Sequence, residues 1–139
     1  MQFTRRTEIA LGILAECALH SERAITTRQM AERIGVKQEY AAKTASMLVR
    51  NGLLTSGGGR AGGLRIAIDP AAVTLGEVVR ITQPELAGAT KNGDGRTCAS
   101  QTLNQMVDAA RQMFMHLAEQ HTLADFDPRL SSCAGNARR

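Results

Sequence analysis

The sequence predicts a mainly α-helical protein that carries one small β-hairpin. Apolar residues recur at intervals of three and four in several separate segments, which is the period of helices that bury one face. Between residues 26 and 63, a capped helix, a turn with glycine and a second helix precede two short apolar runs around a glycine-rich tip. That order indicates a winged helix-turn-helix, with a long C-terminal dimerisation helix after it.

The composition supports one compact fold in a reducing compartment. The chain has 139 residues, 43% of them hydrophobic, with no Trp, one Tyr and three Phe, so aliphatic and Met side chains must fill the core. Three widely spaced cysteines, Cys17, Cys98 and Cys133, do not suit a disulfide framework. The sequence shows no signal-peptide pattern and no long apolar run, and we expect a cytoplasmic protein.

Positive charge is concentrated in the first half of the chain. Residues 1–66 contain ten Lys and Arg against five Asp and Glu, whereas residues 67–139 contain seven against eight. Because phosphates attract cations whatever the base sequence, an anionic partner such as double-stranded DNA is expected for the first half. Judged from charge alone, a basic surface that contacts only solvent is an equally valid interpretation.

The first helix is expected from Thr4 to His20. Ile9, Ile13 and Cys17 recur on one side of it, within a wide apolar arc. Such a helix is core scaffold, and Cys17 is expected to be a buried, unreactive thiol.

A pair of helices is expected next. Thr26 and Gln29 have the spacing of a capping box, and Gly35 ends the helix that they begin. A further helix follows the Gly35-Val36 turn and stops at Asn51-Gly52. Its buried side is predicted to hold Ala41, Thr44, Ala45 and Leu48.

The exposed side of this second helix is the candidate reading surface. In a helix-turn-helix, the N-terminal residues of the second helix face base edges, which makes Lys37, Gln38 and Glu39 the first candidates. An ordinary solvated helix face is the alternative for each of them. The full set of predicted DNA-binding residues is Arg28, Lys37, Gln38, Glu39, Tyr40, Lys43, Gly58 and Arg60.

The wing is predicted from two β-capable runs, residues 53–56 and 64–68, with five glycines among residues 57–63. Glycine allows positive φ angles and lets a backbone approach a phosphate closely, and Arg60 is placed to enter a minor groove or hold a phosphate. A nucleotide-binding loop is excluded because no GKS or GKT sequence follows and no helix begins there. A hairpin without a partner is the remaining alternative.

Two helices are expected in the second half. The shorter runs from Leu75 to Thr82 with Thr74 as its cap, and the longer from Ser100 to Gln120. The longer helix has an apolar stripe that calls for a partner helix, for which a second copy of the chain is the candidate. Val107 and Phe114 widen the stripe and are expected to pack within the same chain. The predicted dimerisation residues are Leu103, Met106, Ala110, Met113 and Leu117.

Several motifs occur in the same order as in one protein family. They are residues 1–4, the turn at 51–56, Gly62-Gly63, residues 73–79 and residues 121–126, together with the helix pair. With them the chain resembles, from residue 1 to about 127, the Rrf-two (Rrf2) family of bacterial winged-helix transcription regulators, which includes IscR, NsrR and RirA. The resemblance implies a homodimer on a partly palindromic operator, usually a repressor that senses iron, nitric oxide or redox state.

The chain departs from the family pattern at the DNA-reading positions and at the sensor. Gly58 stands where members commonly have a wing arginine, and Lys37 stands where a hydroxyl residue caps the recognition helix. The operator sequence therefore cannot be transferred from relatives. Cluster-binding members place three cysteines in the loop before the long helix, whereas the loop from Pro84 to Thr97 leads only to Cys98.

Cys98 is the one sensor or metal-ligand candidate. Thr97 and Ser100 are possible caps of the helix that follows, so the thiol lies near a helix N-terminus beside Arg96, a setting that favours the reactive thiolate. A reversible thiol switch is one interpretation. An iron-sulfur cluster completed by His116, His121, an acidic group or the second subunit is another, and an ordinary loop cysteine is the third.

The predicted organisation has three parts: a DNA-binding region at residues 1–70, a sensor loop and dimerisation helix at 71–128, and a disordered tail at 129–139. No nucleophile elbow, HExxH motif or paired carboxylates favour an enzyme. The predicted function is a homodimeric DNA-binding repressor. The alternatives are a thiol-redox or electron-transfer protein and a helical interaction adaptor, each with a vestigial DNA-binding half.

Overall fold

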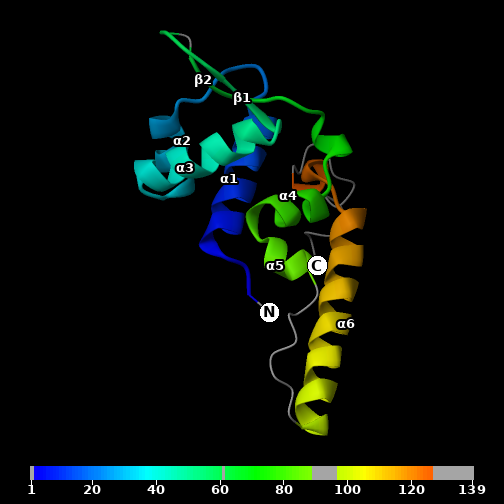
Figure 1. The fold of residues 1–139 in the computed structure, drawn as a ribbon. Coiled ribbons are helices and arrows are strands. Elements are labelled where there is room, and N and C mark those ends of the chain that lie inside the picture. The colour runs from blue at the N-terminus through cyan, green and yellow to red at the C-terminus, as the bar shows by residue number, and fades with distance from the viewer. Residues whose placement is uncertain (1, 61, 89–96, 127–139) are drawn as a thin grey trace, which may run out of the picture.

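The computed structural model describes residues 2–60, 62–88 and 97–126. Three helices and a β-hairpin form one end of the molecule, and a long helix, α6, extends away from them (Figure 1). The prediction of a mainly helical winged helix-turn-helix with a small β-wing is confirmed. No helix among the described residues is long and apolar enough to cross a membrane.

Helix α1, Arg5–Leu19, is the central scaffold, and the predicted helix is confirmed with Thr4 and His20 as its caps. Its apolar side supplies the middle of the core, where Ile13 and Cys17 are buried. The same core contains residues from both halves of the chain, Leu48 and Val78 among them. The helix-turn-helix and the start of the second half therefore fold around one scaffold.

The helix pair forms as predicted. Helix α2, Thr27–Ile34, has a complete capping box from Thr26 and Gln29, and Gly35 ends it with a φ of 70°. Helix α3, Gln38–Arg50, packs on α1 and α2. Its buried residues are the four that the periodicity predicts, namely Ala41, Thr44, Ala45 and Leu48.

The wing is an antiparallel hairpin of β1, Leu54–Gly57, and β2, Gly63–Ile66. A third segment joins it, because the Ile25 N–H donates to the Leu64 carbonyl at 3.0 Å and the Leu64 N–H donates to the Ile25 carbonyl at 2.7 Å. This bridge ties β2, near the end of the ladder that leads into the tip, to the chain just before α2. The hairpin is thus anchored through β2, while its tip projects from the molecule (Figure 1).

Beyond the wing the chain forms a 3-10 turn, Pro70–Ala72, and helix α4, Leu75–Thr82, whose predicted cap Thr74 makes a capping box with Glu77. A short helix, α5, Pro84–Ala87, occupies the start of the segment that the sequence predicts as loop. That part of the prediction is wrong, because proline at the first helical position supports a helical turn. Helix α6, Cys98–Gln120, begins two residues earlier than predicted, with Thr97 as its cap.

The last turn of α6 is joined firmly to α4. The Glu119 carboxylate accepts a hydrogen bond from Thr74 Oγ1 at 3.0 Å and forms an ion pair with Arg80. The Leu75 N–H donates to the His121 carbonyl at 2.8 Å. The chain then forms a 3-10 turn, Leu123–Phe126, whose Leu123 is buried in the core. The C-terminal end of α6 is therefore fixed to the scaffold.

The remainder of α6 presents an apolar face that no described segment covers. Leu103, Met106, Met113 and Leu117 are 55% to 70% exposed, and Ala118 is the one buried residue of the helix among those described. Phe114 packs within the same chain, as predicted, and its partner is Phe3, with ring centroids 5.5 Å apart. The prediction for Val107 is wrong: it is 44% exposed, because the N-terminal half of α6 extends past α4 and α5 (Figure 1).

Candidate DNA-binding surface

The predicted reading residues lie exposed at the start of α3. Lys37 is the cap residue of this helix and makes no capping bond through its side chain, so its ammonium group is not used to hold the helix. Gln38, Glu39 and Tyr40 follow on the first turn, and Lys43 lies one turn farther along. The first turn thus presents a cation, an amide, a carboxylate and a phenol, each of which can form hydrogen bonds.

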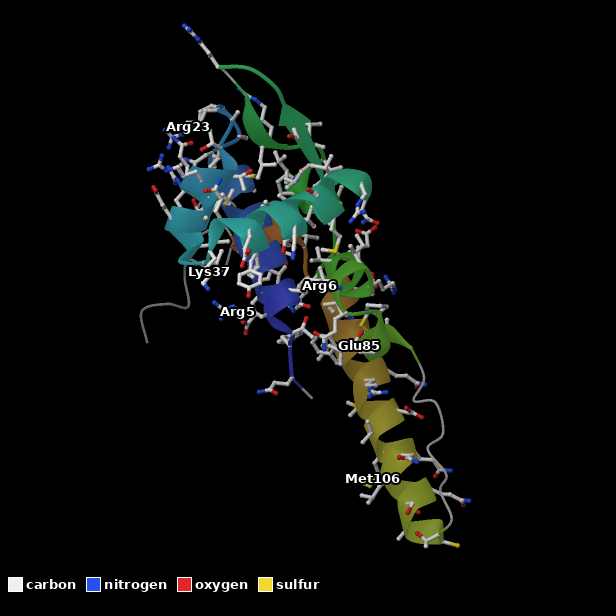
Figure 2. All side chains as sticks on the ribbon, turned by 60° about the vertical axis from the view of Figure 1, so that its left-hand side comes forward. Arg5, Arg6, Arg23, Lys37, Glu85 and Met106 are labelled. Carbon is white, nitrogen blue, oxygen red and sulfur yellow. The ribbon has the colours of Figure 1, made fainter. Side chains whose placement is uncertain are left out.

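A groove of about 1140 Å³ runs along α3 and brings it together with the first turn of α1. Its cationic lining residues are Arg5, Arg6, Lys43 and Arg50, and no acidic residue lines it. Figure 2 shows Arg5 and Arg6 on the first turn of α1, below α3. A concave surface with charges of one sign concentrates the field of those charges, and it therefore attracts phosphates.

Sequence reasoning missed Arg5 and Arg6 as site residues. The Arg-Arg pair directly after the Thr4 cap was a visible signal, but its relation to α3 depends on how the two helices pack. Within the part of the chain that the structure describes, neither arginine forms an ion pair. Arg28, a predicted site residue on α2, differs because its side chain lies 3.5 Å from the carboxylate of Glu32.

Arg60 lies at the exposed tip of the wing, directly after Gly59, whose φ is 84°. Gly58 is open, since a Cβ added there meets no atom within 4 Å. The other end of the tip is crowded: a Cβ at Gly63 would lie 2.8 Å from the Ile25 backbone. The sequence predicts that the glycines let the backbone approach a phosphate. At Gly63 the backbone instead approaches the protein's own chain, at Ile25.

The cysteines fall into different environments. Cys17 is buried in the core, and burial first and the charge of Glu16 second raise the pKa of its thiol to about 12. Its predicted burial is confirmed, and the raised pKa disfavours the thiolate, which is the reactive form. Cys98 is exposed as the first residue of α6. Cys133, Arg96 and the predicted tail lie outside the described residues.

The described residues do not fit an iron-sulfur cluster held within one subunit. His116 is eighteen residues along α6 from Cys98, so the two are about 27 Å apart along the helix axis. The predicted ligand pair of Cys98 with His116 or the more distant His121 is therefore wrong for a single subunit. No group of three or more His, Cys, Asp and Glu residues suited to a metal occurs in the described parts of the chain.

Comparisons with known proteins identify one protein family along nearly the whole described region. A family model described as "Rrf2: Iron-dependent Transcriptional regulator" matches residues 3–127. The HTH-type transcriptional regulator NsrR of Shouchella clausii is 28% identical over 130 residues, which cover 90% of this chain and 87% of NsrR. Protein aau3 of Rhizobium meliloti is 32% identical over 89 residues, 64% of this chain, and the match spans only 58% of aau3.

Solved structures show the same fold. CymR of B. subtilis, described as a global cysteine regulator, superposes with a TM-score of 0.73 at 20% identity, over 90% of this chain and 95% of CymR. At that identity the likeness concerns the arrangement of helices and wing. It extends over α6 as well as the helix-turn-helix, because so much of both chains is covered.

Proposed function

This chain belongs to the Rrf2 family of DNA-binding transcriptional regulators, and we propose that it is a homodimeric repressor that responds to a redox, iron or nitric-oxide signal. The proposed DNA contacts are the first turn of α3, the cationic groove and the wing tip. The observation that carries this assignment is the groove, in which four cations from α1 and α3 lie together with no acidic residue in its lining.

The proposed contacts divide into two kinds. Arg5, Arg6 and Lys43 carry charge along the groove and suit phosphates, which position a protein on the duplex without reading sequence. Lys37, Gln38 and Glu39 lie at the end of α3 that enters the major groove in helix-turn-helix proteins. Gln38 is matched to adenine, Lys37 to guanine and Glu39 to the cytosine amino group.

The apolar face of α6 supports the proposed homodimer. Four large side chains that are more than half exposed form a stripe on one helix, an arrangement that is unfavourable in water. A two-fold contact between two copies of α6 covers the same stripe on both. Since the end of α6 is fixed to α4 and the core, such a contact holds two copies of α3 at one spacing.

Substitutions in the wing and in α3 test the two kinds of contact. Arg60→Ala is expected to weaken binding about equally on operator and random DNA and to lower the salt slope by about one, because a phosphate contact is lost. Gln38→Ala is expected to cost about 1–3 kcal/mol on the operator alone, and to relax preference at particular bases. Fluorescence anisotropy titrations on both duplexes at several salt concentrations measure these changes.

The same titrations distinguish the proposed function from its rivals. Wild-type protein that binds every duplex weakly, with no dependence on salt, is the result expected of an interaction adaptor or a thiol-redox protein. Equal losses on every duplex for both variants contradict the assigned division between phosphate and base contacts.

Cys98 is the proposed site of signal reception, as the exposed thiol among the described cysteines. Oxidation with hydrogen peroxide is expected to change operator affinity in wild-type protein and to leave Cys98→Ser unchanged. Anaerobically purified protein analysed for iron and visible absorption provides the control. Stoichiometric iron with visible bands indicates instead a cluster that needs ligands from the second subunit, and contradicts a simple thiol switch.

A further inference from the structure

The N-terminal segment Gln2–Thr4 is held at two points before it enters α1. The side-chain amide of Gln83, a buried residue between α4 and α5, makes three hydrogen bonds to it and to the first turn of α1. Its Oε1 accepts from the Thr4 N–H at 2.8 Å and from Thr7 Oγ1 at 3.2 Å, while its Nε2 donates to the Gln2 carbonyl at 2.9 Å.

The bonds of Gln83 engage both polar atoms of its amide: Oε1 accepts two hydrogen bonds, and Nε2 donates one. A buried side-chain amide is costly unless its polar atoms are paired, and here both atoms are paired with the same short segment. The neighbouring Thr82 adds to the connection, since its Oγ1 lies 2.9 Å from that of Thr7. The α4–α5 corner therefore fixes the backbone on both sides of Phe3.

Phe3 makes the second attachment. Its ring packs on Phe114 of α6 at a centroid separation of 5.5 Å with a tilt of 59°, a geometry that is favourable for aromatic pairs. The segment thus contacts the long helix through Phe3 and the α4–α5 corner through its backbone. The next two residues along the chain are Arg5 and Arg6, which line the cationic groove beside α3.

From this arrangement we infer that Gln83 is a positioning residue for DNA binding: it orients Arg5 and Arg6 toward the phosphates by fixing the segment that precedes them, and Phe3 links that segment to α6. The inference rests on the proposed function and adds to it a second set of residues, remote from the duplex. It also predicts that the geometry of α6 influences the cationic groove through Phe3.

The salt dependence of DNA binding tests this inference. If Arg5 and Arg6 each contact a phosphate, the Arg5→Ala/Arg6→Ala variant loses about 1.8 from the slope of log K against log salt, and about eightfold in affinity per contact at 0.1 M salt. Gln83→Met, which keeps the length of the side chain and removes its hydrogen bonds, is expected to lose a large part of the same slope. In the triple variant the losses are not additive, because the same contacts are removed.

Two further variants separate positioning from stability. Val79→Ala removes buried methyl groups from α4, the helix that ends just before Gln83, and is expected to lower stability while leaving the slope at its wild-type value. Phe3→Ala changes a residue that is partly exposed, so it is expected to fold even if Gln83→Met does not, and to lower the slope by about one contact.

The inference is overturned if Gln83→Met and Phe3→Ala fold and keep the wild-type slope, or if the losses of Gln83→Met and of the arginine variant simply add. A wild-type slope in the arginine variant overturns it as well. The proposed function survives each of these results as long as the wild-type protein binds its operator selectively.

Discussion

Replacing Met106 and Met113 by Asp is expected to convert the protein into a monomer and to weaken operator binding by about a hundredfold or more. Both side chains lie on the uncovered face of α6, at 63% and 70% exposure, so the change leaves the fold of one chain intact. In a two-fold dimer, the substitutions place four carboxylates in an apolar contact without partners, which is strongly unfavourable. Each monomer then binds one half-site on its own, without a second monomer held next to the other half-site.

Analytical ultracentrifugation and operator titration measure this effect together. Gln105→Asp is the control for an added carboxylate, because it places one at an exposed position of α6 away from the stripe, and it is expected to remain dimeric. A wild-type protein that already sediments as a monomer, or a double variant that stays dimeric with full affinity, contradicts the role given to this face.

Replacing Gly63 by Ala is expected to lower the free energy of unfolding by about 3 kcal/mol. Gly63 has a φ of 150°, and an added Cβ would lie 2.8 Å from the carbonyl carbon and oxygen of Ile25. Neither atom belongs to a flexible side chain, so the wing must move away from the segment before α2. That movement strains the two hydrogen bonds between Ile25 and Leu64.

Urea unfolding followed by circular dichroism measures the change. Gly58→Ala is the control within the same glycine-rich tip, since its Cβ meets no atom within 4 Å, and its stability is expected to stay within about 0.5 kcal/mol of the wild type. Equal stabilities of the two variants contradict the close packing described between Gly63 and the Ile25 backbone.

Local chemistry made much of the fold predictable. Two helix starts are recognisable from capping pairs, Thr26 with Gln29 and Thr74 with Glu77. Each pair satisfies backbone N–H groups within four residues. Gly35 indicates a helix end because glycine adopts a positive φ at little cost in free energy. The buried face of α3 followed from its period alone, without knowledge of what would cover it.

Features that depend on packing between distant segments were not predictable. Arg5 and Arg6 join the site only because α1 passes beside α3, and the role of Gly63 depends on Ile25, which lies 38 residues earlier. Val107 has the same apolar character as Phe114, yet Phe114 packs on Phe3, whereas Val107 lies on the part of α6 that extends past α4 and α5. Periodicity identifies a face of a helix, whereas the neighbour of that face is set by the tertiary fold.

Selection of genomic fragments that bind the purified protein is the decisive measurement for the role of paired α3 helices. The recovered sequences are expected to converge on a partly palindromic site whose half-sites lie about one helical turn, or a whole number of turns, apart. Conversion to a monomer by the α6 substitutions should abolish that two-fold pattern. Fragments without any common sequence, recovered under both reducing and oxidising conditions, would contradict a dimer that reads operator DNA through α3.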